Sequence, residues 1–134
     1  RNPDRALMVV IDASALVDAL LINGAARSRL AAERLQAPEL IDAELLSVLR
    51  RLVLSSKLQE GDALQALTVA HQLGLRRHAS RTLWRRAWEL RLNLSAYEAL
   101  YVALAEQLQA PLLTADARLM RAPGLRCCVE LIKP

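Results

Sequence analysis

The chain of 134 residues contains no phenylalanine, and its aromatic residues are two tryptophans and two tyrosines. Because hydrophobic residues still make up 54% of the sequence, we expect a core built almost entirely from aliphatic side chains. No apolar run approaches the roughly 20 residues of a membrane-spanning helix, and the N-terminus lacks the apolar segment of a signal peptide. We therefore expect a globular protein that resides in the cytoplasm and makes no membrane contact.

Cysteine is equally scarce, with one adjacent pair, Cys127 and Cys128. Neighbouring cysteines rarely bridge each other, and the sequence has no CxxC or Cys/His spacing that is typical of zinc sites. His71 and His78 lie outside any HExxH pattern. We expect all four to be packing or surface residues rather than metal ligands.

Charge is slightly unbalanced, since 18 basic and 14 acidic residues leave a net charge of +4. Nearly all the basic residues are arginines, and six of them lie between positions 76 and 91. Arginine makes paired hydrogen bonds to phosphate, so this segment could hold a nucleic-acid backbone, although a solvated helix face has the same composition. The candidate phosphate contacts are Arg81, Arg85, Arg86 and Arg118.

Trp84 and Trp88 are one helical turn apart and lie on the same side of an expected helix. Two such rings can stack on nucleic-acid bases. We expect them instead to pack in the interior, because a chain without phenylalanine has few other side chains of that bulk.

Strand and helix patterns alternate along the chain, which predicts an α/β fold with a mostly parallel sheet. Met8 to Ile11 is a short apolar run typical of a parallel strand buried on both faces. We assign residues 1–7 to an N-terminal extension or expression remnant, and 8–134 to a single domain. Further strands are expected at 75–78, 111–114 and 127–132, and helices from Ala13 to about Asn23 and at 25–35, 39–55, 60–73 (capped by Gly74), 80–91 (capped by Ser80), 95–109 and 116–121.

Two aspartates follow expected strands. Asp12 comes directly after the first strand, and Asp116 lies just past the strand at 111–114. The carboxyl ends of parallel strands meet at one edge of the sheet, which is where such sheets bind ligands. Each aspartate could alternatively serve as the N-cap of the helix that follows it.

Two glutamates lie on the apolar faces of expected helices, Glu44 in the helix at 39–55 and Glu98 in the helix at 95–109. Glu98 could instead close a capping box with Ser95. Glu44 is harder to explain, because its apolar stripe offers no cationic neighbour. The flanking apolar residues are Ile41, Val48 and Leu52 for Glu44, and Leu94, Val102 and Ala105 for Glu98.

Together these four acids predict a divalent metal site. An unpaired buried carboxylate costs several kcal/mol, so acids placed at buried positions call for a cation. Carboxylate oxygens suit hard ions such as Mg²⁺ or Mn²⁺, which can activate a water and stabilise charge on an attacked phosphate. A phosphoacceptor receiver domain also has an acidic pocket, but it needs a pocket lysine, and neither Lys57 nor Lys133 follows a buried strand.

Four segments, in order, resemble the motifs of PIN-domain proteins, in particular VapC-type toxins of type II toxin–antitoxin systems. The resemblance covers essentially the whole chain from Met8, and the order of the four motifs makes it specific. The segments are VVIDASALV at 9–17, APELIDAE at 37–44 followed by LRR at 49–51, LSAYEALYVALA at 94–105, and PLLTADARL at 111–119.

The resemblance implies a three-layer α/β/α fold and an endoribonuclease that depends on Mg²⁺ or Mn²⁺. It also implies a homodimer and a cognate VapB-like antitoxin whose C-terminal segment inserts near the acidic pocket. Contact with DNA is implied only through that antitoxin. By position, Asp12, Glu44 and Asp116 match the family's metal-binding acids. Ser14 and Thr114 match hydroxyl positions that support the site.

The chain departs from the family pattern at Glu98, where an aspartate is usual. The additional methylene displaces the carboxylate by about 1.5 Å, a shift to which metal sites are sensitive. Two functions therefore stay open: a ribonuclease that uses Asp12, Glu44, Glu98 and Asp116, or a PIN-like RNA- and partner-binding module with weak or lost catalysis. For the antitoxin helix, a groove is expected at Leu30, Leu46, Leu49 and Val53, although these residues could equally form plain core.

Overall fold

The computed structural model describes residues 6–132, which form one sheet of five parallel strands. The strand order is β3-β2-β1-β4-β5, so the first strand of the chain lies at the centre of the sheet. This confirms the predicted parallel α/β class. The strands are β1 (Met8–Ile11), β2 (Arg34–Pro38), β3 (Arg76–His78), β4 (Leu112–Thr114) and β5 (Val129–Leu131).

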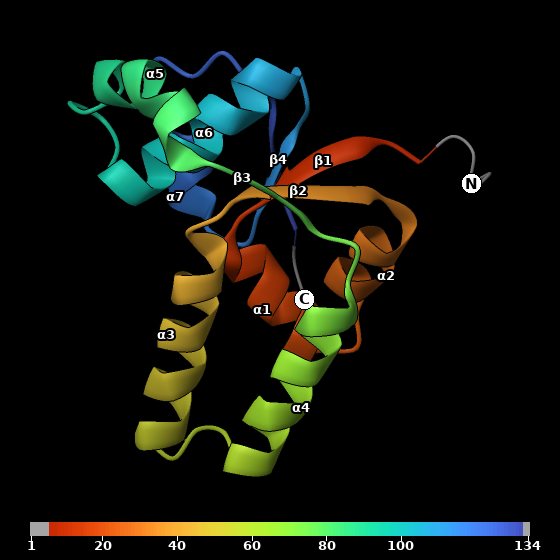
Figure 1. The fold of residues 1–134 in the computed structure, drawn as a ribbon. Coiled ribbons are helices and arrows are strands. Elements are labelled where there is room, and N and C mark those ends of the chain that lie inside the picture. The colour runs from red at the N-terminus through yellow and green to blue at the C-terminus, as the bar shows by residue number, and fades with distance from the viewer. Residues whose placement is uncertain (1–5, 133–134) are drawn as a thin grey trace.

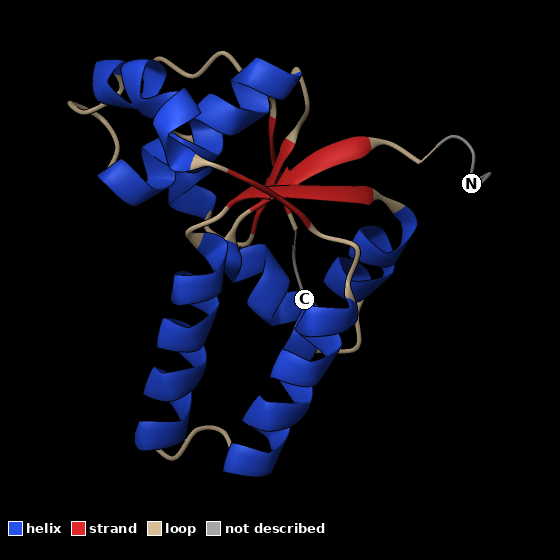
Figure 2. Cartoon of the chain, in the orientation of Figure 1, coloured by secondary structure: helices blue, strands red, loops and turns tan. Residues whose placement is uncertain are grey.

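Helices cover both faces of the sheet, which gives the expected three-layer α/β/α architecture (Figures 1 and 2). On one face α1 packs against α2, α3 and α4, while on the other α6 packs against α5 and over the central strands. No helix within residues 6–132 is both long and apolar enough to cross a bilayer. The helices are α1 (Ala13–Leu21), α2 (Ala25–Ala32), α3 (Ile41–Leu54), α4 (Glu60–Gln72), the 3₁₀ turn η2 (Ser80–Leu83), α5 (Trp84–Glu89), α6 (Ala96–Leu108) and α7 (Ala117–Met120).

The core is aliphatic, as the composition predicts, and it centres on β1, β4 and α6. Of the four aromatic residues, Tyr101 alone is buried. The expectation that the two tryptophans pack in the interior is wrong, because Trp84 is 66% exposed and Trp88 is 67% exposed. Alanines and leucines of α6 fill the space above the sheet instead.

The sequence prediction fails at residues 33–38. The helix expected over 25–35 ends at Ala32, and the chain then enters β2 between β1 and β3. Leu, Gln, Arg and Ala favour helices in isolation, which is why the local pattern misleads. Pairing on both sides satisfies the backbone of β2, and residues 35–38 are buried there. Tertiary pairing therefore overrides local propensity at this strand.

Two of the expected helix caps are also wrong. Ser80 makes no capping hydrogen bond and lies inside the turn η2, whose N-cap is Ala79. The helix expected over 80–91 is split into η2 and α5. Leu73, rather than Gly74, is the C-cap of α4. The other expected elements are present, with bounds that differ by a few residues.

The strand order places the candidate site. From β1 the chain runs outward to β2 and β3, and it then crosses to the opposite side of β1 to form β4 and β5. The direction of winding therefore reverses at β1, and a crevice forms at the carboxyl ends of the strands at such a reversal. Asp12 follows β1 at this position, α3 follows β2 there, and Asp116 follows β4.

Candidate active site

Asp12 is the most deeply held of the four acids. One carboxylate oxygen accepts hydrogen bonds from the Ser14 hydroxyl at 2.6 Å and the Ala15 amide at 2.9 Å, and the other accepts one from the Thr114 hydroxyl at 2.5 Å. Asp12 is thus the N-cap of α1, as its alternative interpretation predicted. Burial raises the pKa of Asp12, although these hydrogen bonds partly oppose the shift.

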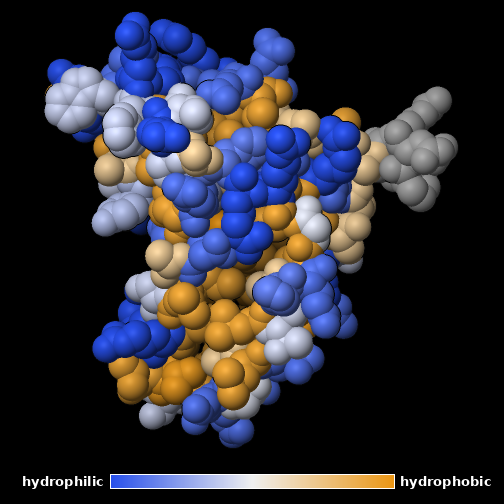
Figure 3. Space-filling view, viewed as in Figure 1, coloured by the Kyte–Doolittle hydropathy of each residue, from blue (hydrophilic) through white to orange (hydrophobic). Residues whose placement is uncertain are grey.

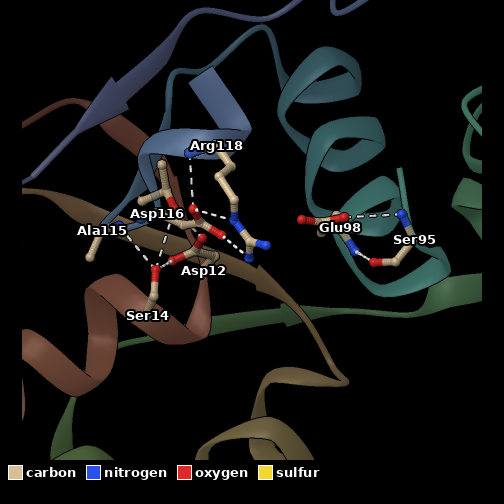
Figure 4. Close-up of polar contacts among 8 residues, drawn as sticks. Asp12, Ser14, Ser95, Glu98, Ala115, Asp116 and Arg118 are labelled. Atoms are coloured by element: carbon tan, nitrogen blue, oxygen red, sulfur yellow. Dashed lines mark hydrogen bonds and ion pairs between the residues drawn. The ribbon is translucent and has the colours of Figure 1, made fainter. Parts of the chain in front are cut away.

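Ser14 and Thr114 connect the ends of β1 and β4. Their hydroxyl oxygens lie 3.3 Å apart, the Ser14 oxygen accepts a bond from the Ala115 amide, and the Thr114 oxygen accepts one from the Asp116 amide. Both hydroxyls also donate to Asp12, so they are the neighbours that orient its carboxylate; Figure 4 shows the bond from Ser14. The small hydroxyl residues therefore fix the relative positions of two of the acids.

Asp116 is the N-cap of α7 and faces Arg118. The Arg118 guanidinium donates to both carboxylate oxygens, at 3.2 and 2.9 Å, and its amide donates at 2.9 Å (Figure 4). These bonds lower the pKa of Asp116. The Arg118 side chain is 81% exposed, so the pair lies at the mouth of the site, where solvent weakens it.

Glu44 points inward from the first turn of α3 and meets α6. The Tyr101 hydroxyl donates a hydrogen bond of 2.6 Å to its carboxylate. Burial raises the pKa of Glu44, and the negative charges of Asp12 and Glu98 raise it further, against the Tyr101 bond. A neutral phenol, rather than a cation, is therefore the partner of this half-buried acid.

Glu98 closes the capping box that its sequence context predicts, and it also lines the acidic pocket. Its carboxylate accepts a hydrogen bond of 3.0 Å from the Ser95 amide, and its own amide donates to the Ser95 hydroxyl, which completes the capping box. At the same time Glu98 lines the acidic pocket, on the side that faces Arg118 (Figure 4). The capping bond therefore competes with any ligand for one of its oxygens.

The four acids line one pocket of about 500 Å³ at the carboxyl edge of the sheet. Their charges act on one another: Asp116 raises the pKa of Asp12, as Asp12 does that of Glu44. Within residues 6–132, no three Asp, Glu, His or Cys side chains converge closely enough to form a complete metal-binding group. Four acidic side chains thus share a pocket and repel one another, each engaged with a protein donor.

Sequence reasoning missed three residues that line this pocket, namely Tyr101, Asp18 and Arg51. Tyr101 follows Glu98 by three positions, a spacing that places both on one face of α6 and could have identified it. Asp18 lies in α1, and burial raises its pKa. Arg51 reaches the pocket from α3, two turns beyond Glu44, and it is the second arginine at the site after Arg118.

The candidate phosphate contacts have different surroundings. Arg81 and Arg85 are exposed. Arg86 instead donates to Glu106 at 2.6 Å and to the Gly124 carbonyl at 2.9 Å, so it joins α5 to α6 and to the loop before β5. It lines a separate hollow of about 830 Å³, which the half-buried Cys127 also borders.

The remaining candidates agree with their expected roles. Cys127 and Cys128 are free thiols, and burial raises the pKa of Cys127 to about 11, which disfavours the thiolate and is consistent with a packing role. His78 shares a 2.7 Å hydrogen bond with Gln36 on the neighbouring strand. His71 is exposed on α4.

Comparison with known proteins identifies the family. The PIN domain family matches residues 9–125. Ribonuclease VapC9 from Mycobacterium tuberculosis (strain ATCC 25618 / H37Rv) is 46% identical over 125 residues, which cover 93% of this chain and 98% of the relative. The chain belongs to the VapC family of PIN-domain proteins. The resemblance seen in the four sequence motifs is thereby confirmed.

Solved structures of VapC-family proteins share the fold. VapBC2 from Rickettsia felis, solved bound to a DNA fragment from its promoter, superposes with a TM-score of 0.70 at 15% identity and covers 92% of this chain and 98% of that one. Mycobacterium tuberculosis VapC20, a sarcin–ricin loop cleaving toxin, gives a TM-score of 0.63 at 18% identity, with 94% and 99% covered. At these identities the likeness concerns the fold.

Proposed function

We propose that this VapC-family chain is a metal-dependent endoribonuclease toxin that cleaves RNA phosphodiesters at the acidic pocket. The observation that carries the proposal is the shared pocket of Asp12, Glu44, Glu98 and Asp116, in a chain 46% identical to a ribonuclease. Carboxylate oxygens are the ligand type that a hard divalent cation prefers, and the four come from four different parts of the chain around one pocket. The acids repel one another, and a cation bound among them would offset that repulsion.

In this function Asp12 and Asp116 at the sheet edge, together with Glu44 and Glu98 of α3 and α6, would hold Mg²⁺ or Mn²⁺. Bound there, the ion would supply Lewis-acid stabilisation of the attacked phosphate and lower the pKa of the attacking water. Ser14 and Thr114 keep the Asp12 carboxylate oriented, since both donate to it. Asp116 must release Arg118, whose guanidinium is then free to contact substrate phosphate.

Among the remaining arginines, the exposed Arg81 and Arg85 are the phosphate contacts that we propose. Arg86 is already bound to Glu106 and Gly124, and we assign it a structural role. Arginine neutralises backbone phosphate without reading sequence, so these contacts would supply affinity rather than specificity.

The first test is RNA cleavage by the purified chain without antitoxin, with tRNA and structured RNA in Mg²⁺, Mn²⁺ or EDTA. We expect cleavage that requires metal and that Asp12→Ala abolishes. Asp42→Asn is the matched control, because Asp42 is an exposed acid of α3 bound to Arg77 outside the pocket. Cleavage that persists in EDTA or in Asp12→Ala would contradict the proposal.

A PIN-like binding module without turnover is the second candidate, and one observation favours it. Glu98 closes a capping box, and the acids in the described residues do not converge on one point. Such a module would bind RNA without cutting it, even with metal. If neither the unsubstituted protein nor Glu98→Asp cleaves RNA, and both are folded, the binding module is the better candidate.

We further propose a VapB-like antitoxin as partner, docked on the helical layer formed by α1 to α4. Apolar side chains gather on the α3 and α4 side of the molecule (Figure 3). Of the four residues predicted to form the groove, Leu30 and Leu49 are buried core, whereas Leu46 is 54% exposed. The exposed apolar residues of this layer are Leu46, Leu54, Leu64 and Val69. Co-expression with the neighbouring gene should yield a tight stoichiometric complex that Leu46→Glu disrupts.

The homodimer is a separate proposal, which light scattering of the purified chain tests directly. Contact with DNA is proposed only through the antitoxin. Promoter DNA should therefore bind the complex and not the isolated chain in a mobility-shift assay. Residence in the cytoplasm likewise remains a prediction, to be checked by cell fractionation.

A further inference from the structure

Trp84 and Trp88 leave two thirds of their surface in solvent, although burial of such rings contributes more than that of any other side chain. They border a hollow between α5 and the start of α6. We call this hollow the Trp groove. Its apolar walls are Ala87, Leu94, Ala96 and Leu100.

Arg91 lies over one face of the Trp88 ring. Its guanidinium carbon lies 4.6 Å from the ring centroid, and the guanidinium also donates a 3.0 Å hydrogen bond to the Trp88 carbonyl. The cation is therefore fixed over one face of the indole, while the ring as a whole stays exposed. Exposed aromatic rings with arginines beside them are the groups on which proteins stack unpaired bases, and the face of Trp88 away from Arg91 can serve in this way.

The charge around the Trp groove selects the kind of partner. Arg91 lines the groove, and the exposed Arg81 and Arg85 lie on the same segment of the chain, Arg85 at the separate hollow that Arg86 borders. The acid of this segment, Glu89, lies 3.8 Å from Arg86. This segment therefore carries more positive than negative charge, which suits a polyanion. A second copy of the chain docked on the same face about a two-fold axis would bring like charges together, which disfavours that occupant.

The Trp groove and the acidic pocket are lined by consecutive residues at the start of α6. Ser95 and Ala96 line the groove, and the next two residues, Tyr97 and Glu98, line the pocket. Tyr97 is 63% exposed between the two. An RNA strand that presents a phosphate to the acids would therefore lay neighbouring nucleotides along the first turn of α6 toward the tryptophans.

We propose that the Trp groove binds single-stranded RNA beside the cleavage point by stacking its bases on Trp84 and Trp88. The substrate class is thus RNA with unpaired bases, such as a loop, because the faces of paired bases are covered by their neighbours in a duplex. This inference rests on the proposed ribonuclease function for the location of the cut. Binding itself requires neither metal nor turnover.

Intrinsic fluorescence tests the proposal directly, because Trp84 and Trp88 are the chain's two tryptophans. The full chain carrying Asp12→Ala is titrated in EDTA with a mixed-sequence single-stranded RNA of about 20 nucleotides, and with the same RNA as a duplex. We expect saturable quenching by the single strand and little by the duplex. Trp88→Leu and Arg91→Gln should weaken binding, the former about tenfold.

Leu92→Ala is the matched control, since Leu92 is 86% exposed next to Arg91 yet does not line the Trp groove. Binding without quenching, or unchanged affinity in Trp88→Leu, would overturn the proposal. So would fluorescence that changes with protein concentration alone, which would mark a dimer face. Saturable quenching by single-stranded RNA, from an unsubstituted chain that cleaves no RNA even with metal, would contradict the ribonuclease function and support RNA binding in the Trp groove. Metal-dependent cleavage with the same KM in Trp88→Leu would support the ribonuclease function and contradict RNA binding in the groove.

Discussion

The hydroxyl of Tyr101 donates a 2.6 Å hydrogen bond to Glu44, and this bond joins α6 to α3 across the acidic pocket. Only 3% of the Tyr101 surface is exposed, so its hydroxyl has few alternative partners. Burial raises the pKa of the Tyr101 phenol, and the hydrogen bond to Glu44 raises it further, so the phenol stays protonated. Tyr101 is therefore a positioning residue for Glu44.

Replacement of Tyr101 by phenylalanine should reduce metal-dependent cleavage about tenfold, as loss of a partner to a metal ligand commonly does. The bond stabilises the charged form of Glu44, so its removal should also raise the pKa of Glu44 and move the acidic limb of the pH–rate profile upward. Cleavage at a series of Mg²⁺ concentrations and pH values measures both effects. Tyr97→Phe, at an exposed tyrosine, should change neither.

Without metal, Asp12 and Glu44 should make the protein less stable as pH rises. Both have native pKa values raised above their ordinary values of 3.8 and 4.5. The native state therefore holds more protons than the unfolded state between those values and the raised ones, and stability falls across that interval. Asp116 acts oppositely, because its pKa is lowered and its contribution is lost as pH falls.

Asp12→Asn should accordingly raise the melting temperature of the metal-free protein at pH 7.5 by a few degrees, roughly 1 kcal/mol in unfolding free energy. Asparagine keeps the capping geometry of Asp12 without its charge. Added Mg²⁺ should stabilise the unsubstituted chain and leave Asp12→Asn nearly unaffected, as thermal denaturation can measure. An equal shift in both proteins would show that Asp12 does not hold the ion.

Shortening Glu98 to aspartate should separate its two roles. The shorter side chain cannot close the capping box as well, so α6 should lose about 0.5–1 kcal/mol of stability. The carboxylate released from the Ser95 amide should bind metal more tightly and raise the cleavage rate several-fold. Ser95→Ala is the control, since it weakens the cap and leaves the acid in place. A faster rate in Ser95→Ala as well would attribute the gain to the loss of the cap.

Arg85 and Arg86 are neighbours with different expected phenotypes. Arg86→Ala should lower the unfolding free energy by about 2 kcal/mol, because Glu106, whose side chain is 10% exposed, would lose its charged partner. Arg85→Ala should leave stability within about 0.5 kcal/mol and weaken RNA binding. Urea denaturation and an RNA mobility shift distinguish them. Equal destabilisation by both substitutions would contradict the assignment.

Much of the fold was predictable because local signals agreed with it. The apolar run before Asp12 predicted a buried strand, and the Ser95 capping box marked the start of α6 to the residue. The failure at β2 has a specific cause: the segment around Leu35 carries no local strand signal and becomes a strand through pairing with β1 and β3. That pairing is a long-range effect, which sequence periodicity does not contain.

The sequence by itself determined that Asp12 and Asp116 lie close together, since each follows a strand that ends at the same edge of a parallel sheet. Only the tertiary structure decided their partners. Tyr101 meets Glu44 because α6 packs across the sheet from α3, a contact between residues 57 positions apart. It also decided that Trp88 lies in solvent, because residue bulk alone does not reveal whether the fold leaves room inside. The positions of strands, helices and acids along the chain follow from local sequence patterns. Side-chain contacts and exposure follow from how the helices pack on the sheet.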